Sequence, residues 1–216
     1  MKLRALSHYD NDKDTRYGDC ILLYDNSSLI VYDCGHIRHT QEVENFLETN
    51  SLISQVYIVI SHNDSDHTNG VIELLEYLYN EQYMVTVYSS LYLKSARKVL
   101  DVLDDERRTL PATKKHILEK FDNIKKIVEK AQEYDFIVKD ASVNTKVAAG
   151  IIVGPTEDEF VEVVAQAIED DSITKIEGET VMNAASVQLK CVLDGAQMIL
   201  LCGDAAPSYL HSLDSY

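Results

Sequence analysis

The chain is 216 residues long, which is enough for one large domain or two small ones with a buried core. Its 45% apolar and 26% charged residues are typical of a soluble globular protein, and no segment approaches the roughly 18 apolar residues of a membrane helix. The N-terminal segment lacks the apolar run of a signal peptide, so we expect a cytoplasmic protein without membrane contact. The formal net charge of −16 argues against a surface that wraps nucleic acid irrespective of sequence.

The charge is unevenly distributed along the chain. Residues 94–130 hold 11 Lys and Arg against 7 Asp and Glu, whereas the rest of the chain holds 9 basic and 29 acidic residues. The basic segment is either a solvated helical face or a surface that faces a substrate or partner.

The four cysteines form no CxxC pair, and each lies in or beside an apolar run. We therefore interpret them as buried free thiols rather than as disulfides or a zinc cluster; they are Cys20, Cys34, Cys191 and Cys202.

The first half of the chain alternates predicted strands and helices. Residues 20–24 and 28–32 are β-rich runs that flank the turn sequence Asp-Asn-Ser, so they predict a hairpin. Residues 41–47 are predicted to be helical. The continuous apolar run at residues 55–60 is typical of a strand that is covered on both faces.

A predicted helix at residues 71–80 and a strand at 83–88 follow. Residues 95–133 are predicted to form two helices that divide near Pro111, because proline is poorly tolerated inside a helix. We interpret residues 91–134 as a helical insertion in a single domain that spans residues 1–216.

Residues 136–138 and 148–153 are predicted strands, and the acidic segment 157–180 is expected to be partly helical and exposed. A second hairpin is predicted from residues 185–193 and 196–201 around Asp194-Gly195, a strong turn dipeptide. The order of these elements predicts a mixed α/β layered domain.

One segment concentrates side chains that bind metals. Residues 61–70 read SHNDSDHTNG and place His62, Asp64, Asp66 and His67 directly after a buried strand. Such groups are costly to place beside a core unless something pairs with them, and a divalent cation pairs with all four. Residues two apart on a tight loop can point the same way, so two adjacent metal sites are possible. A plain polar loop is the structural alternative.

The string from His62 to His67 resembles the HxHxDH signature of the metallo-β-lactamase superfamily, with Asp64 in place of the second histidine. This variant is similar to the hydrolase domain of competence (DNA-uptake) proteins and their free-standing relatives. Four further stretches resemble motifs of that group in the same order; they are residues 17–23, 31–35, 183–187 and 200–205.

The resemblance implies a four-layer αββα sandwich that holds up to two divalent ions, Zn or Mn, with Mg as a further option. It implies that His62 and Asp64 bind one ion and that Asp66 and His67 bind the second. Asp204 would bridge the two ions, and Asp66 and Asp204 would be the catalytic carboxylates. The resemblance also implies that three residues support these ligands from behind; they are Asp33, Asn183 and Ser186.

The sequence departs from the family pattern in two ways. Asp64 makes the first site richer in oxygen, which favours Mn or Mg, although Zn remains compatible. The usual late histidine is absent, and we expect His211 and His116 to be exposed surface residues. His36 and His39 are expected to have plain loop roles.

The residues alone predict metal-assisted hydrolysis, and the resemblance narrows this to a phosphodiesterase or nuclease that acts on nucleic acid or a nucleotide. A non-catalytic sensing or scaffold module is the alternative, and so is a truncated chain that lacks the C-terminal portion of the sandwich. In the truncated case we expect a homo-oligomer, or a partner chain that completes the C-terminal sheet and supplies a histidine.

Overall fold

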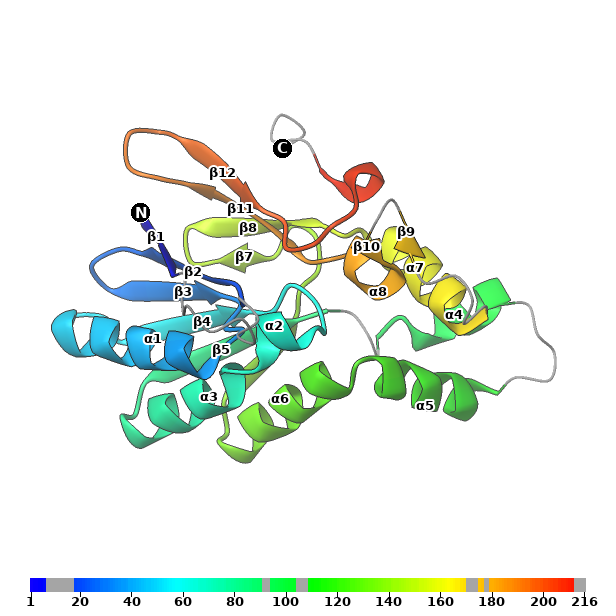
Figure 1. Cartoon of the computed structure of the whole chain (residues 1–216), viewed down its shortest axis with the longest axis horizontal. Helices are drawn as coiled ribbons and strands as arrows, with labels where there is room; N and C mark the ends of the chain where they lie inside the picture. Colours follow the sequence, from blue (N-terminus) through cyan, green and yellow to red (C-terminus); the bar gives the residue numbers. More distant parts are fainter. Residues whose placement is uncertain (7–17, 91–93, 104–108, 170–174, 177–178, 212–216) are drawn as a thin grey trace, which may run out of the picture.

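Two β-sheets pack face to face, and helices cover the outer face of the first (Figure 1). The computed structural model describes residues 1–6, 18–90, 94–103, 109–169, 175–176 and 179–211. The first sheet has the strand order β1-β2-β3-β4-β5-β6, antiparallel from β1 to β3 and parallel from β3 to β6. Its strands are β1 (Lys2–Leu6), β2 (Cys20–Tyr24), β3 (Ser28–Tyr32), β4 (Gln55–Val59), β5 (Met84–Ser89) and β6 (Ile137–Asp140).

Both faces of the first sheet are buried because its central strands β3, β4 and β5 are apolar at most positions. In β3, Leu29 and Val31 join the core beneath the helices, while Ile30 and Tyr32 join the core between the two sheets. This alternation follows from the two-residue period of a strand. The predicted hairpin of β2 and β3 is confirmed with its bounds.

The outer helical layer consists of α1 (Ile37–Thr49), α3 (Val71–Asn80) and α6 (Asp122–Glu133), which pack on the first sheet. The predicted bounds of α3 are confirmed. The prediction succeeded because the buried residues of α3 recur at helical spacing. The helix α1 is longer than the predicted 41–47, since His36 caps it four residues earlier.

The predicted helical insertion contains three helices rather than two. They are α4 (Ala96–Leu103), α5 (Leu110–Lys120) and α6. The expected division is confirmed, because Thr109 caps α5 and Pro111 lies in its first turn. A second break at Phe121 was not predicted. Residues 91–93 and 104–108 of this segment lie outside the described residues.

The second sheet is antiparallel with the order β12-β11-β8-β7. Its predicted hairpin is confirmed, and Gly195 takes the positive φ that the turn requires (84°). On its outer face Val192 and Met198 are 47% and 48% exposed, so no described element covers this end of the sheet. The strands are β7 (Lys146–Val147), β8 (Gly150–Gly154), β11 (Gln188–Val192) and β12 (Met198–Leu201).

The expectation that residues 157–180 are exposed is wrong for most of the described part. The helix α7 (Glu157–Glu169) buries Phe160, Val164 and other apolar residues against α4 and the short helix α8 (Val181–Ala184). The remaining short elements are α2 (Ser65–Thr68), β9 (Lys175–Ile176), β10 (Glu179–Thr180) and a 3-10 turn (Pro207–Tyr209).

The mixed α/β class and the face-to-face sheets predicted from the sequence are confirmed. The cysteines are free thiols, as predicted; three are buried and Cys202 is partly exposed. Among the described helices, none combines the length and apolar character needed to cross a membrane.

Candidate metal centre

The centre forms where parallel strands β3 and β4 end side by side. The residue after β3 is Asp33, and the candidate metal-binding loop, residues 61–70, begins after β4 at Ser61. Asp33 is fully buried and has a positive φ of 60°. Its Oδ1 accepts a hydrogen bond from the Ser61 backbone N–H (2.7 Å), and its Oδ2 accepts one from the Ser61 hydroxyl (2.6 Å). Asp33 therefore fixes the start of the loop.

Asp33 also orients His67. The Nδ1–H of His67 donates to Asp33 Oδ2 at 2.9 Å, which leaves Nε2 directed away from this pair. Burial by itself would lower the pKa of His67, but the hydrogen bond and negative charge of Asp33 outweigh it and raise the pKa to about 9. Burial raises the pKa of Asp33, and the hydrogen bonds from His67 and Ser61 oppose that effect. A cation at Nε2 would take the place of the second imidazolium proton.

Ser61 orients the second histidine of the loop. Its hydroxyl hydrogen is donated to Asp33, so Ser61 Oγ accepts the Nδ1–H of His62 at 2.9 Å. Burial and the charge of His67 lower the pKa of His62 to about 3, so this imidazole is neutral. The neutral ring therefore presents the lone pair of Nε2, as a metal ligand does.

The second sheet supplies the carboxylate that faces both histidines. Asp204 follows β12 and the glycine Gly203, whose φ is +50°. A Cβ on Gly203 would lie 2.7 Å from Ser61 Cβ, so only glycine lets this turn approach the loop. His62 Nε2 lies 3.8 Å from Asp204 Oδ2, and His67 Nε2 lies 3.7 Å from Asp204 Oδ1.

These three residues fit a divalent cation. Ligand atoms of His62, His67 and Asp204 all lie within 4.8 Å of one another. Two ligands on a tetrahedral zinc ion are about 3.4 Å apart, only a few tenths of an ångström less than the observed N–O distances. The decisive observation is that His62 Nε2 is buried and has no hydrogen-bond partner among the described residues, which is costly unless a ligand occupies its lone pair.

The two other predicted carboxylate ligands lie outside this group. Asp64 is partly buried, and its Oδ2 accepts a hydrogen bond from Asn183 Nδ2 (2.9 Å), so the predicted support from Asn183 acts on Asp64. Asn183 Oδ1 is buried without a hydrogen-bond partner. Asp66 is partly buried in α2. Ser186 is fully buried and donates to the Asn183 carbonyl oxygen (2.7 Å), so it shapes the turn that holds Asn183.

A tight backbone contact fixes the far end of the loop. The carbonyl oxygen of Asp66 accepts a hydrogen bond from Asp19 N (2.8 Å), and a Cβ on Gly35 would lie 1.5 Å from that oxygen. The segments after β3 and before β2 therefore enclose α2 closely. This explains why the predicted stretches 17–23 and 31–35 both contain glycine; Tyr17 itself lies outside the described residues.

The other histidines that the structure describes lie elsewhere. His211 is not the exposed residue we expected: its side chain is 17% exposed, and Nε2 lies 3.0 Å from Glu159 Oε2 of α7. His116 is exposed on α5, as predicted. His36 precedes α1 and caps it through Nδ1, whereas His39 is buried within the helix, so the plain loop role expected for His39 is wrong.

Two residues of the centre were not predicted from the sequence: Ser61, whose hydroxyl links Asp33 to His62, and Asn63, which contacts α6. The signal for Ser61 was available, since it is a hydroxyl between a buried strand and the first histidine. Asn63 gave no signal, because its partners lie 60 and 61 residues away.

The basic segment is largely paired internally where the structure describes it. Arg97 pairs with Asp101 (3.2 Å), and Lys98 pairs with Glu157 of α7 (2.7 Å). Further pairs link neighbouring turns of α5 and α6. These contacts favour the solvated helical face over a surface for an anionic partner.

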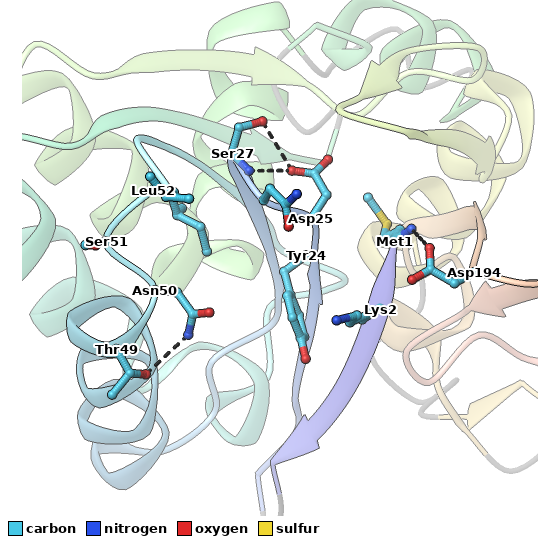
Figure 2. Close-up of a pocket in the computed structure, with 12 residues that line it drawn as sticks. Met1, Lys2, Tyr24, Asp25, Ser27, Thr49, Asn50, Ser51, Leu52 and Asp194 are labelled. Carbon is cyan, nitrogen blue, oxygen red and sulfur yellow. Dashed lines mark hydrogen bonds and ion pairs between the residues drawn. The ribbon is translucent and has the colours of Figure 1, made fainter.

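A cavity of about 670 Å³ lies at the opposite end of the first sheet, by the turn between β2 and β3 (Figure 2). Its polar groups satisfy one another: Asp25 accepts the backbone N–H of Ser27, and the N-terminal ammonium group pairs with Asp194. None of the three clustered ligands lines it. The candidate metal centre is therefore separate from this cavity.

No protein-family model matches the chain, and no curated protein matches its sequence. A solved structure from Thermotoga maritima, described as a "putative metallo-beta-lactamase", is similar to 93% of this chain and 76% of that chain, with a TM-score of 0.41 and 9% identity. The side-chain geometry around Asp204 is therefore the basis for the function proposed below.

Proposed function

We propose that this protein is a metal-dependent hydrolase whose primary cation site consists of His62, His67 and Asp204. The observation that carries the proposal is the buried, unpartnered Nε2 of His62, which faces Asp204 Oδ2 at 3.8 Å. A cation would satisfy this atom and balance the carboxylates around it.

The two oxygens of Asp204 face different histidines, which suits a bridge between two cations. We assign Asp64 and Asp66 as further oxygen ligands; the sequence pattern pairs Asp64 with His62 at one ion and Asp66 with His67 at the second. Oxygen ligands of this kind favour Mn or Mg beside Zn. When bound, such ions generate a nucleophile from water at neutral pH and polarise the oxygen of the bond to be broken.

Two neighbouring residues fix the protonation and the ring orientation of His62 and His67. Asp33 and Ser61 keep a hydrogen on Nδ1 of both histidines, so both Nε2 atoms point toward Asp204. The Asp33–His67 pair corresponds to the carboxylate–histidine–metal arrangement that fixes a ligand ring.

We further propose a phosphodiester as the substrate class, in a single strand or a small nucleotide. The net charge of −16 disfavours duplex DNA, because a long polyanion would be repelled by most of the surface. A non-catalytic metal-binding module is the second candidate. It is favoured by the fact that, among the described residues, only three ligands meet, while His116 and His211 lie elsewhere.

The test combines metal content with turnover. The wild-type protein should bind at least one equivalent of Zn or Mn, and the Asp66→Ala/His67→Ala variant should bind less. With Mn, single-stranded DNA should be cleaved faster than duplex, and Asp204→Asn should reduce the rate at least about 100-fold. Asp194→Asn, at the opposite end of the β11–β12 hairpin, is the matched control and should retain the rate.

Three outcomes separate the candidates. Equal and negligible metal in wild type and double variant would overturn the ligand assignment. Stoichiometric metal without turnover of any phosphodiester would favour the non-catalytic module. Undiminished cleavage by Asp204→Asn would locate the activity at a different centre.

A further inference from the structure

The helix α6 is attached to the metal-binding loop by two reciprocal hydrogen bonds. Asn123 Nδ2 donates to the backbone oxygen of Asn63 (2.8 Å), and the backbone N–H of Ile124 donates to Asn63 Oδ1 (3.0 Å). Asn63 stands between His62 and Asp64 in the chain; the first bond holds the Asn63–Asp64 peptide unit, and the second holds the Asn63 side chain.

Asn63 acts as the cap that α6 lacks locally. The residue before the helix is Phe121, which provides no side-chain hydrogen bond to the first turn. The first N–H groups of any helix need acceptors from outside the helix, and asparagine is among the best capping side chains. Here the acceptor comes from 61 residues away.

The helix is a fixed anchor for this contact. Its residues Ile124, Ile127 and Ala131 are buried, and α6 packs on α3 and on the strands β5 and β6. Figure 1 shows the start of α6 beneath α2, and these two helices are in contact. The loop is therefore held by an element that belongs to the main core.

His62 is thus constrained from both sides. Before it, Ser61 is tied to Asp33, and after it, Asn63 is tied to α6. The imidazole has only two rotatable bonds between these fixed points and its Nε2. Small shifts of the Asn63 peptide would therefore change the 3.8 Å separation between Nε2 and Asp204.

We infer that Asn63 is a positioning residue that links the position of α6 to the metal affinity of the site. The inference rests on the proposed metal site and extends it, because it makes α6 a structural control on His62. Residues that support metal ligands typically change the affinity 10–100-fold when removed, and we expect a loss in this range.

The experiment uses the full chain and three variants. Asn63→Ala removes the acceptor of Ile124. Asn123→Asp removes the donor to Asn63 yet places a carboxylate at a helix N-terminus, where it does not weaken the helix. Asn69→Ala, an exposed asparagine near the other end of the same loop, is the matched control.

Zinc affinity is measured without urea, by competition with a chromophoric chelator. Urea unfolding curves first establish that each variant is folded under these conditions. Asn63→Ala and Asn123→Asp should each bind zinc about 10–100-fold more weakly, and Asn69→Ala should match the wild type. If Asn63→Ala does not fold, Asn123→Asp carries the test. Wild-type affinity in both variants would overturn the inference.

Two readouts without metal separate this inference from the proposed function. Hydrogen exchange of the Ile124 amide should accelerate in Asn63→Ala and be restored in Asn63→Asp, which keeps the acceptor. The imidazole ¹⁵N resonances of His62 should shift in Asn63→Ala. If the wild type bound no zinc, a shifted His62 would still support the positioning role, and an unshifted one would refute it.

Discussion

At the scale of single residues, Asp33 carries two energetic costs. A buried carboxylate is costly, and a non-glycine residue with φ near 60° adds backbone strain. Both costs are offset by three hydrogen bonds from Ser61 and His67. Asparagine and aspartate tolerate this backbone conformation better than other side chains, so the position combines a turn requirement with a charge requirement.

The substitution Asp33→Asn separates the two requirements. Asparagine keeps the backbone conformation and an acceptor oxygen, but it removes the charge that holds His67. We expect zinc affinity to fall about 10–100-fold while the protein stays folded. Asp25→Asn, in the turn between β2 and β3, is the matched control because it also receives backbone N–H groups but lies far from the site. Equal affinities for both variants would contradict this role of Asp33.

At the scale of elements, local pattern predicted the parts whose burial follows a simple period. The bounds of α3 emerged from helical spacing, and those of β3 from a β-rich run next to turn residues. The break between α5 and α6 did not, because no proline or glycine marks Phe121 and the cap of α6 comes from Asn63. Such tertiary capping has no local sequence signal.

Acidic residues at the start of α7 suggested exposure, although its later residues are apolar and buried. Acidic side chains are favourable in any first helical turn, so they report the helix end rather than its environment. For the site, the loop string indicated His62 and His67 from local chemistry. The approach of Asp204 depends on the packing of two sheets, and only the resemblance suggested it.

The hairpin of β11 and β12 offers a matched pair of glycines. Gly203 (φ +50°) and Gly195 (φ +84°) both occupy the left-handed region, but a Cβ would meet Ser61 only at Gly203. Alanine should cost about 1–2 kcal/mol at either position through backbone strain. Gly203→Ala should cost about 1–3 kcal/mol more through the clash and should weaken zinc binding.

Urea unfolding measures the two free energies, and the chelator competition measures zinc affinity. Equal destabilisation by the two alanines, with zinc affinity unchanged, would show that the Gly203 turn can move away from Ser61 without disturbing Asp204.

At the scale of the whole molecule, the negative net charge affects the stability of the folded state. With 36 acidic and 20 basic residues, the folded chain repels itself more strongly than the expanded chain. Raising NaCl from about 10 to 150 mM shortens the screening length to about 8 Å, so the free energy of unfolding should rise. Sucrose at matched osmolarity controls for effects unrelated to charge. If the free energy of unfolding stayed constant or fell, salt would weaken the ion pairs on the helical surfaces by more than it relieves the repulsion from the net charge.

Hydrogen bonds join the two sheets at the candidate metal-binding loop. Val187 N donates to the Ser61 carbonyl oxygen (2.8 Å), and the Tyr32 hydroxyl donates to the Val187 carbonyl oxygen (2.6 Å), a contact 155 residues apart in sequence. Bonds between such distant segments form only after most of the chain has been ordered. The first sheet therefore cannot part from the second without dismantling the loop that carries both histidines. We therefore expect the Val187 amide to exchange slowly with solvent, at the rate at which the whole sandwich opens cooperatively. A partly folded intermediate in which the sheets are apart should not bind metal.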